Sequence, residues 1–171
     1  MNEQAPAFAR SPIIVGTIPG QNPAVWARAV ELAEALAAPL VAAYVDPASY
    51  LIEWKAGNEV APTSLDPVLE PDDEAALAAA GIRDAFGPAA SGHGVAWSLR
   101  VIGGDPALAL GRLATAVGAS SIVIGTRRLG LLAKVNELAT GSLMHRLLAT
   151  QHLPVLGIPS HEAHHRLRAH E

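Results

Sequence analysis

Short apolar runs alternate with segments of helical periodicity along most of the chain. Five runs have the length and composition of β-strands, and they occupy residues 12–18, 40–45, 95–101, 121–124 and 154–159. Between them, apolar side chains recur at three- and four-residue spacing, which predicts helices over residues 23–36, 71–86, 106–117 and 142–150. This alternation favours an α/β fold with a five-stranded parallel sheet and helices on both faces. We expect the doubly wound, Rossmann-like strand order 3-2-1-4-5.

Capping residues, prolines and glycines set the predicted helix boundaries. Asn22 and Asp105 stand where N-caps are expected, and each is followed by a proline that suits the first helical turn. Gly87 and Pro88 predict the end of the second helix. Residues 89–94 are then expected to form a flexible turn before the third strand.

The length of 171 residues fits one domain, which we expect to span residues 11–159. Residues 1–10 form an N-terminal arm in this interpretation, and residues 160–171 form a polar tail rich in histidine. Residues 48–70 have no clear period and are predicted to form a long surface loop. Trp54 lies in that loop; anchoring of the loop to the domain is the preferred interpretation, and a partner or ligand surface is the alternative.

The composition narrows the functional classes. Half of the residues are hydrophobic and 16% are charged, which argues against disorder. The absence of cysteine excludes disulfides, thiolate catalysis and zinc-finger chemistry. A net charge of -4 and an aromatic content of 4% disfavour nucleic-acid binding. No apolar run approaches the roughly 20 residues of a membrane span and no signal peptide is recognisable, so we expect a cytoplasmic protein.

The most informative segment is IVIGTRRLGLLAKVNELATGSLMHRLL, residues 122–148. Gly125 follows the fourth predicted strand, next to the first strand, where ligands usually bind in a doubly wound sheet. Gly141 and Ser142 open the last helix and offer backbone amides and a hydroxyl to an anion, and Arg127 and Arg128 add charge. The alternative is a strand-to-helix connection with a capping serine and no ligand. The segment is not a P-loop, because Leu131 and Leu132 replace the lysine and hydroxyl residue of that motif.

Two phrases, GGDPALALGRLATAVGASSIVIGTRR and GSLMHRLLATQHLPVLGIP, resemble the universal stress protein family. The resemblance covers residues 11–159 apart from the excursion at 48–70. It implies a five-stranded fold of the adenine nucleotide alpha hydrolase type and a homodimer formed through the last strand, residues 154–159. It also implies an ATP site with a glycine motif after strand four and an aspartate after strand one.

Carried over to this chain, Gly125, Gly141 and Ser142 match that motif. Arg128 replaces the second glycine, the spacing becomes Gly-x4-Gly-x10-Gly-Ser, Ile18 replaces the aspartate, and Met144 replaces a small hydroxyl residue. The candidate nucleotide-binding residues are Thr17, Val45, Gly125, Thr126, Arg127, Arg128, Gly130, Gly141 and Ser142. The implied cofactor is ATP, with Mg²⁺.

Two functional hypotheses remain open at this point. The chain is either a stress-response or regulatory module that binds an adenine nucleotide between strands one and four, or a nucleotide-independent, dimeric interaction or protective protein with a degenerate pocket. No enzymatic role is expected, although slow ATP hydrolysis stays open, because the acidic run 72–74 suits a helix N-terminus better than acid–base catalysis. No metal site is expected either, since the histidine-rich tail is terminal. His93 and His145 are expected at the surface, and Trp26 at the edge of the core.

Overall fold

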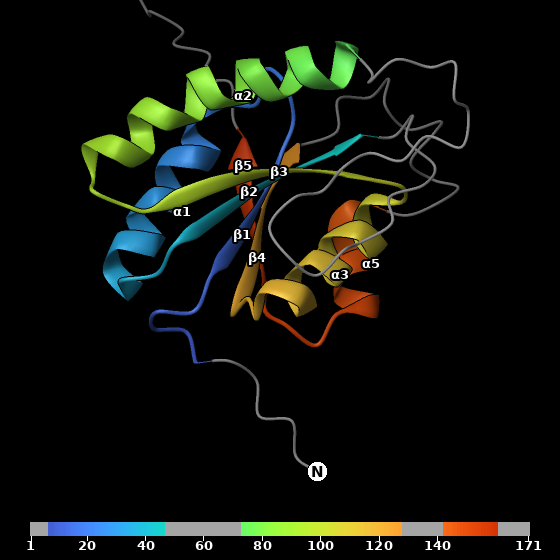
Figure 1. The fold of residues 1–171 in the computed structure, drawn as a ribbon. Coiled ribbons are helices and arrows are strands. Elements are labelled where there is room, and N and C mark those ends of the chain that lie inside the picture. Colours follow the sequence, from blue (N-terminus) through green and yellow to red (C-terminus); the bar gives the residue numbers. More distant parts are fainter. Residues whose placement is uncertain (1–6, 47–72, 128–141, 161–171) are drawn as a thin grey trace, which may run out of the picture.

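The computed structural model describes residues 7–46, 73–127 and 142–160, and the remaining segments, including the predicted loop 48–70 and the tail after 160, lie outside the described residues. The described part contains five strands and four helices (Figure 1). Their bounds are β1 (Ile13–Thr17), α1 (Pro23–Leu36), β2 (Leu40–Asp46), α2 (Asp73–Gly92), β3 (Trp97–Gly103), α3 (Pro106–Val117), β4 (Ser121–Arg127), α5 (Leu143–Thr150) and β5 (Val155–Ser160).

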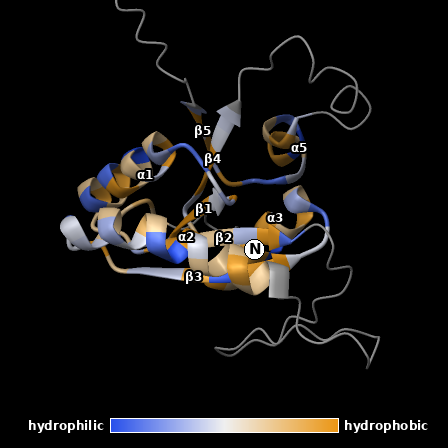
Figure 2. Cartoon of the chain, turned by 90° about the horizontal axis from the view of Figure 1, so that it is seen from above, coloured by the Kyte–Doolittle hydropathy of each residue, from blue (hydrophilic) through white to orange (hydrophobic). Residues whose placement is uncertain are grey.

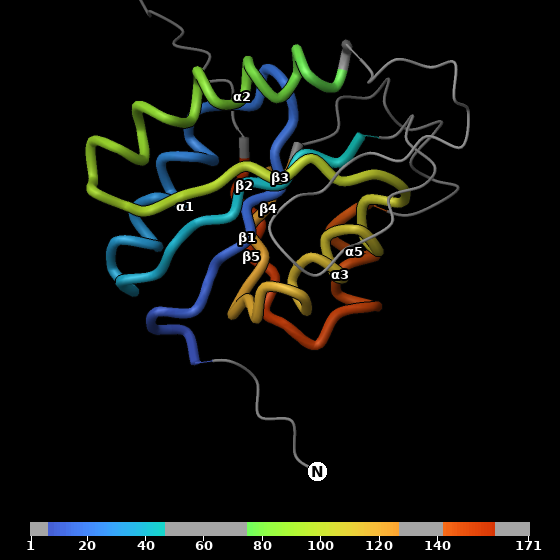
Figure 3. The backbone as a smooth tube through the Cα atoms, viewed as in Figure 1, coloured from blue at the N-terminus to red at the C-terminus, as the bar shows by residue number. Residues whose placement is uncertain are grey.

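All four strand pairings are parallel, and the sheet has the order β3-β2-β1-β4-β5, which confirms the predicted topology. Helices α1 and α2 cover one face, and α3 and α5 cover the other, as the view from above in Figure 2 shows. The tube in Figure 3 follows the chain from β1 over the carboxyl edge of the sheet and back into α1. The described connections, from β1 to α1 and from β3 to α3, leave the sheet at that edge.

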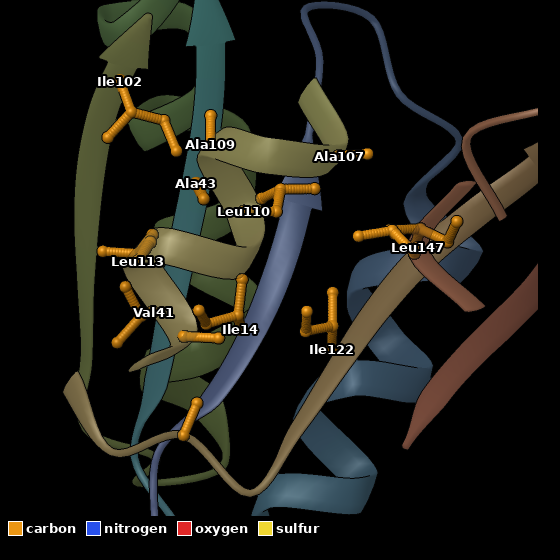
Figure 4. Packing of buried hydrophobic residues seen from close by; sticks show 13 residues of the cluster. Ile14, Val41, Ala43, Ile102, Ala107, Ala109, Leu110, Leu113, Ile122 and Leu147 are labelled. Carbon is orange, nitrogen blue, oxygen red and sulfur yellow. The ribbon is translucent and has the colours of Figure 1, made fainter. Parts of the chain in front are cut away.

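Each face of the sheet has its own hydrophobic core. On the α3 and α5 face, side chains of four strands meet buried leucines of both helices, among them Leu110, Leu113 and Leu147 (Figure 4). On the α1 and α2 face, Phe86 lies between Trp26 and Trp97, with ring centroids 5.8 Å and 4.9 Å apart in edge-to-face contacts. Trp26 is thus inside this core and not at its edge. Each fully buried side chain of this size contributes about 1.5–3 kcal/mol.

The predicted N-caps are confirmed. The side chain of Asn22 accepts a hydrogen bond from the amide of Ala24 at 2.9 Å, and that of Asp105 accepts one from Leu108 at 3.1 Å. Pro23 and Pro106 follow in the first turn. These bonds satisfy helix amides that have no partner inside the helix, so both helices begin where the sequence predicts.

The predicted end of the second helix is wrong. Helix α2 continues through Gly87 and Pro88 to Gly92, so there is no flexible turn over most of residues 89–94. A proline inside a helix costs about 3 kcal/mol because it lacks an amide proton and crowds the preceding turn. Phe86 and Ala90 are both buried on either side of Pro88, and their packing offsets that loss. His93 is exposed, as expected, and its Nδ1 lies 2.8 Å from Oε2 of Glu34 of α1.

Candidate functional site

The first feature of the site is the point where β1 and β4 stop pairing. β1 pairs with β2 along its whole length, up to Thr17 opposite Tyr44. Its pairing with β4 ends earlier, at Val15 opposite Val123, although β4 continues beside β5 to Arg127. The two central strands therefore part at their carboxyl ends. In a doubly wound sheet this is the place where the connections diverge and ligands bind.

Several predicted site residues lie at this edge. Continuing the register of β1 and β4 places Gly125 opposite Thr17. Thr17 is only 3% exposed, and within the described residues its Oγ1 has no hydrogen-bond partner. Val45 of β2 is partly buried against the core of the α3 and α5 face. Ile18, which stands at the aspartate position of the resemblance, is 44% exposed, so its side chain is not part of the core.

The connection from β1 to α1 contributes Gln21, a residue that the sequence analysis did not single out. Its Oε1 accepts a hydrogen bond from the amide of Ile18 at 2.9 Å, and its Nε2 donates to the carbonyl of Gly16 at 3.4 Å. The sequence feature that could have indicated Gln21 is a polar side chain directly after a turn glycine. That glycine is Gly20, whose φ is +68°. That pattern is common to many turns and does not by itself indicate a site.

Gly125 is in close contact with this connection. A Cβ at Gly125 would lie 3.0 Å from Cγ2 of Val25 and 3.7 Å from Nε2 of Gln21. A larger residue would push against the first turns of α1. Glycine therefore keeps the end of β4 close to α1, and Gly125 belongs to strand β4, whereas the sequence placed it in a loop.

The N-terminus of α5 is the third component. Ser142 caps the helix: its Oγ accepts from the amide of His145 at 3.2 Å and its carbonyl accepts from Arg146 at 3.0 Å. Among the described residues, no acceptor faces the amides of Leu143 and Met144. His145 itself is exposed, as expected. Two helical amides are thus available where the helix dipole favours an anion.

The other two described N-caps differ from that of α5. In α1 the proline Pro23 has no amide proton, and Asn22 binds the amides of both Ala24 and Val25. In α3 the carboxylate of Asp105 already occupies the N-terminus. Of these three helices, α5 is the one that leaves backbone donors for an external acceptor.

Helix α5 is fixed to α3 by an ion pair and a close packing contact. The guanidinium of Arg146 bonds to the carboxylate of Asp105, the N-cap of α3. This hydrogen bond holds the pKa of the Asp105 carboxyl below its ordinary value; the amide of Leu108 acts in the same direction, and burial opposes both. At the other end of α5, the side chain of Gln151 packs directly on Gly111 of α3.

Helix α5 is also fixed to the sheet through Met144. Its methyl group packs where a Cβ of Gly157 would stand, and Cγ2 of Thr126 lies 2.8 Å from the same point. Thr126 is thus brought next to α5, on the opposite face of the sheet from the contact of Gly125 with α1. Met144 therefore takes up space beside the end of β4.

Some predicted site residues cannot be placed. Arg128, Gly130 and Gly141 lie outside the described residues, and of Arg127 only its position as the last residue of β4 is described. Within the described ranges, no three side chains of histidine, aspartate or glutamate gather as a metal site would require. In the same ranges no helix is both long and apolar enough to cross a membrane.

Comparison with solved structures supports the fold. A universal stress protein in complex with cAMP aligns over 90% of this chain and 99% of its own, with 21% identity and a TM-score of 0.60. A member of the family from Burkholderia pseudomallei aligns over 91% and 100%, with 27% identity and a TM-score of 0.59. The universal stress protein from Archaeoglobus fulgidus in complex with dAMP aligns over 86% and 97%, with 18% identity and a TM-score of 0.58.

The sequence comparisons give the family. No curated protein matches the chain in sequence. The sequence model of the universal stress protein family, however, matches residues 10–159, which include all the strands and helices described above except the last residue of β5. The chain is therefore a member of the universal stress protein family.

Proposed function

We propose that this protein binds an adenine nucleotide at the carboxyl edge of the sheet, between β1 and β4. The observation that carries the proposal is the parting of these strands beside a helix whose first two amides, those of Leu143 and Met144, have no acceptor in the described part of the chain. The complexes of similar proteins with cAMP and dAMP support the same class of ligand. Within this proposal, the protein acts in stress response or its regulation by sensing such a nucleotide, and its role is binding and not catalysis.

The proposed site residues lie on a phosphate side and a nucleoside side of the ligand. The phosphates would bind at the N-terminus of α5, to Gly141, Ser142 and the amides after them, with Arg127 and Arg128 neutralising their charge. Gly125, Thr126 and Gly130 would complete the phosphate side. Thr17 and Val45 would lie on the nucleoside side, where the Oγ1 of Thr17, which has no partner in the described part of the chain, is an available donor. We propose ATP with Mg²⁺ as the ligand.

Ile18, in place of the family's aspartate, lowers the expected affinity for the nucleotide. A carboxylate at this position would add a charge-assisted hydrogen bond to the nucleoside, and such a bond contributes about 1.5–3 kcal/mol. Ile18 cannot form it. The site therefore depends more on its phosphate contacts than a site that has the aspartate.

A second candidate function is a homodimeric interaction or protective role without nucleotide. The observation that favours it is that side chains fill part of the proposed site. Met144 takes up space beside Thr126, and Val25 and Gln21 lie against Gly125. The dimer would form through residues 154–159, because β5 is an edge strand of the described sheet and Leu156 is 45% exposed.

A pair of substitutions at Ser142 tests nucleotide binding without loss of the helix cap. Asparagine and aspartate both cap helices well, so Ser142→Asn and Ser142→Asp should keep the stability of the protein within about 0.5 kcal/mol of each other. Only aspartate places a negative charge where phosphates would bind. In calorimetric titrations with ATP and Mg²⁺, we expect Ser142→Asn to retain most of the affinity and Ser142→Asp to lose at least about tenfold, or 1.4 kcal/mol.

The titration also separates the two functions. Binding of ATP by the unchanged protein and by Ser142→Asn, but not by Ser142→Asp, supports the phosphate site at α5. Equal affinities of the two variants would place the phosphates elsewhere. No heat at millimolar ATP, AMP and cAMP in the unchanged protein would leave the nucleotide-independent dimer as the function.

A further inference from the structure

The carboxamide of Gln21 occupies the position that a residue of β4 would have in a continuous ladder. In a parallel pair, one residue bonds to the carbonyl before and the amide after the residue opposite it. For Thr17 these groups are the carbonyl of Gly16 and the amide of Ile18, and the register places Gly125 opposite. Gln21 binds both groups, since its Nε2 donates to Gly16 at 3.4 Å and its Oε1 accepts from Ile18 at 2.9 Å.

The turn between β1 and α1 brings the glutamine to this position. The amide of Gln21 donates to the carbonyl of Ile18 at 3.2 Å, and Gly20 between them adopts a positive φ of 68°. The side chain thereby folds back over the end of β1 and towards β4, where its Nε2 lies 3.7 Å from the position of a Cβ on Gly125. The carboxamide thus lies at the point where the two strands part.

We propose that Gln21 is a positioning residue of the nucleotide site, because it ends the β1–β4 ladder and leaves the backbone of Gly125 to a ligand. This inference rests on the proposed function. In a continuous ladder, the amide of Gly125 would donate to the carbonyl of Gly16, and the carbonyl of Gly125 would accept from the amide of Ile18. With Gln21 in their place, the amide of the exposed Gly125 can donate to an oxygen of the nucleotide, and its lack of a side chain leaves that amide accessible.

The test is the replacement of Gln21 by leucine, which has a similar volume and no hydrogen-bonding group. In Gln21→Leu, the Gly16 carbonyl and the Ile18 amide lose their partners and should pair with Gly125 instead. We therefore expect hydrogen exchange of the Gly125 amide, followed by NMR without nucleotide, to slow at least tenfold. If Gln21 had only a structural role, its replacement would loosen this edge of the sheet and speed the exchange. The direction of the change therefore distinguishes the two roles.

The second measurement is the affinity for ATP with Mg²⁺, which should fall at least tenfold in Gln21→Leu because the Gly125 amide is then used within the sheet. Glu31→Gln is the control. Glu31 lies on the exposed side of α1, where it pairs with Arg28, and this replacement should change neither the Gly125 exchange nor the affinity.

The outcomes separate this inference from the proposed function. Exchange at Gly125 that is unchanged or faster in Gln21→Leu overturns the ladder role. Equal ATP affinities of Gln21→Leu and the unchanged protein overturn the positioning role. If the unchanged protein binds no nucleotide, the proposed function and the positioning role both fail, while slower exchange at Gly125 still supports the ladder role of Gln21.

Discussion

Individual glycines determine which side chains can come close to the carboxyl edge. Gly125 admits Val25 of α1, and Gly157 admits Met144 of α5. The sequence marked Met144 as a departure from the family motif, but only the structure shows that its side chain fills the space above Gly157. Met144 and Gly157 therefore form a matched pair, in which the size of one residue depends on the absence of a side chain at the other.

This pairing predicts the effect of adding a methyl group at Gly157. Gly157→Ala forces the Met144 side chain to move, and we expect a loss of about 1–3 kcal/mol in the free energy of unfolding. Met144→Ala in the same chain removes the closer of the two contacts and leaves that with Thr126, so the double variant should lose less than the sum of the single losses. Urea unfolding measures all three variants.

Gly81→Ala in α2 is the control for this cycle. No heavy atom of the described residues outside its own helix lies within 4 Å of the position of its Cβ, so the variant should be at least as stable as the unchanged protein. Strictly additive losses for Gly157→Ala and Met144→Ala would contradict the matched pair.

At the scale of elements, the sequence predicted the five strands and four helices of the described residues, and the strand order. Periodicity and caps are local properties, and they were sufficient for these features. The end of α2 was not predictable in this way, because the burial of Phe86 and Ala90 outweighs the local preference of Gly87 and Pro88 to end a helix. The proposed role of Gln21 was not predictable either: its hydrogen bonds are local, but that role depends on where β4 stops pairing with β1.

The link between α3 and α5 predicts a pH dependence of stability. Asp105→Asn keeps a capping side chain but removes the charge that pairs with Arg146. Because both side chains are partly exposed, we expect a loss of only about 0.5–1 kcal/mol at neutral pH. The pKa of Asp105 in the folded protein lies below its ordinary value of 3.8, so the carboxylate stabilises the fold above that value.

The difference between the two proteins should be constant from neutral pH down to about pH 5 and then shrink as the pH falls through the folded-state pKa. Urea unfolding across this range is the measurement. Glu31→Gln, which breaks the more exposed pair with Arg28 on α1, serves as the control and should change stability little. A difference that grows on acidification would contradict the assignment.

At the scale of the whole molecule, the edge formed by β5 is the surface that the proposed dimer would use. Leu156 on this strand is 45% exposed. A charged residue on an edge strand opposes pairing with another chain. Leu156→Lys should therefore convert the proposed dimer to a monomer at micromolar concentration in sedimentation experiments, without loss of secondary structure by circular dichroism.

Leu77→Lys is the matched control, since Leu77 on α2 is 73% exposed and lies on a different element. It should leave the sedimentation coefficient unchanged. A monomer in the unchanged protein would contradict the dimer directly, and a dimer that persists in Leu156→Lys would place the interface on another surface.

The early end of the β1–β4 ladder gives the sheet the shape of a fork. Below Val15 and Val123 the five strands form one continuous surface; above them, β3, β2 and β1 make one prong, and β4 and β5 make the other. A molecule lodged in the fork would touch both prongs and brace them against each other. Since β5 pairs with β4, a change in the separation of β1 and β4 at this end would also change the orientation of β5.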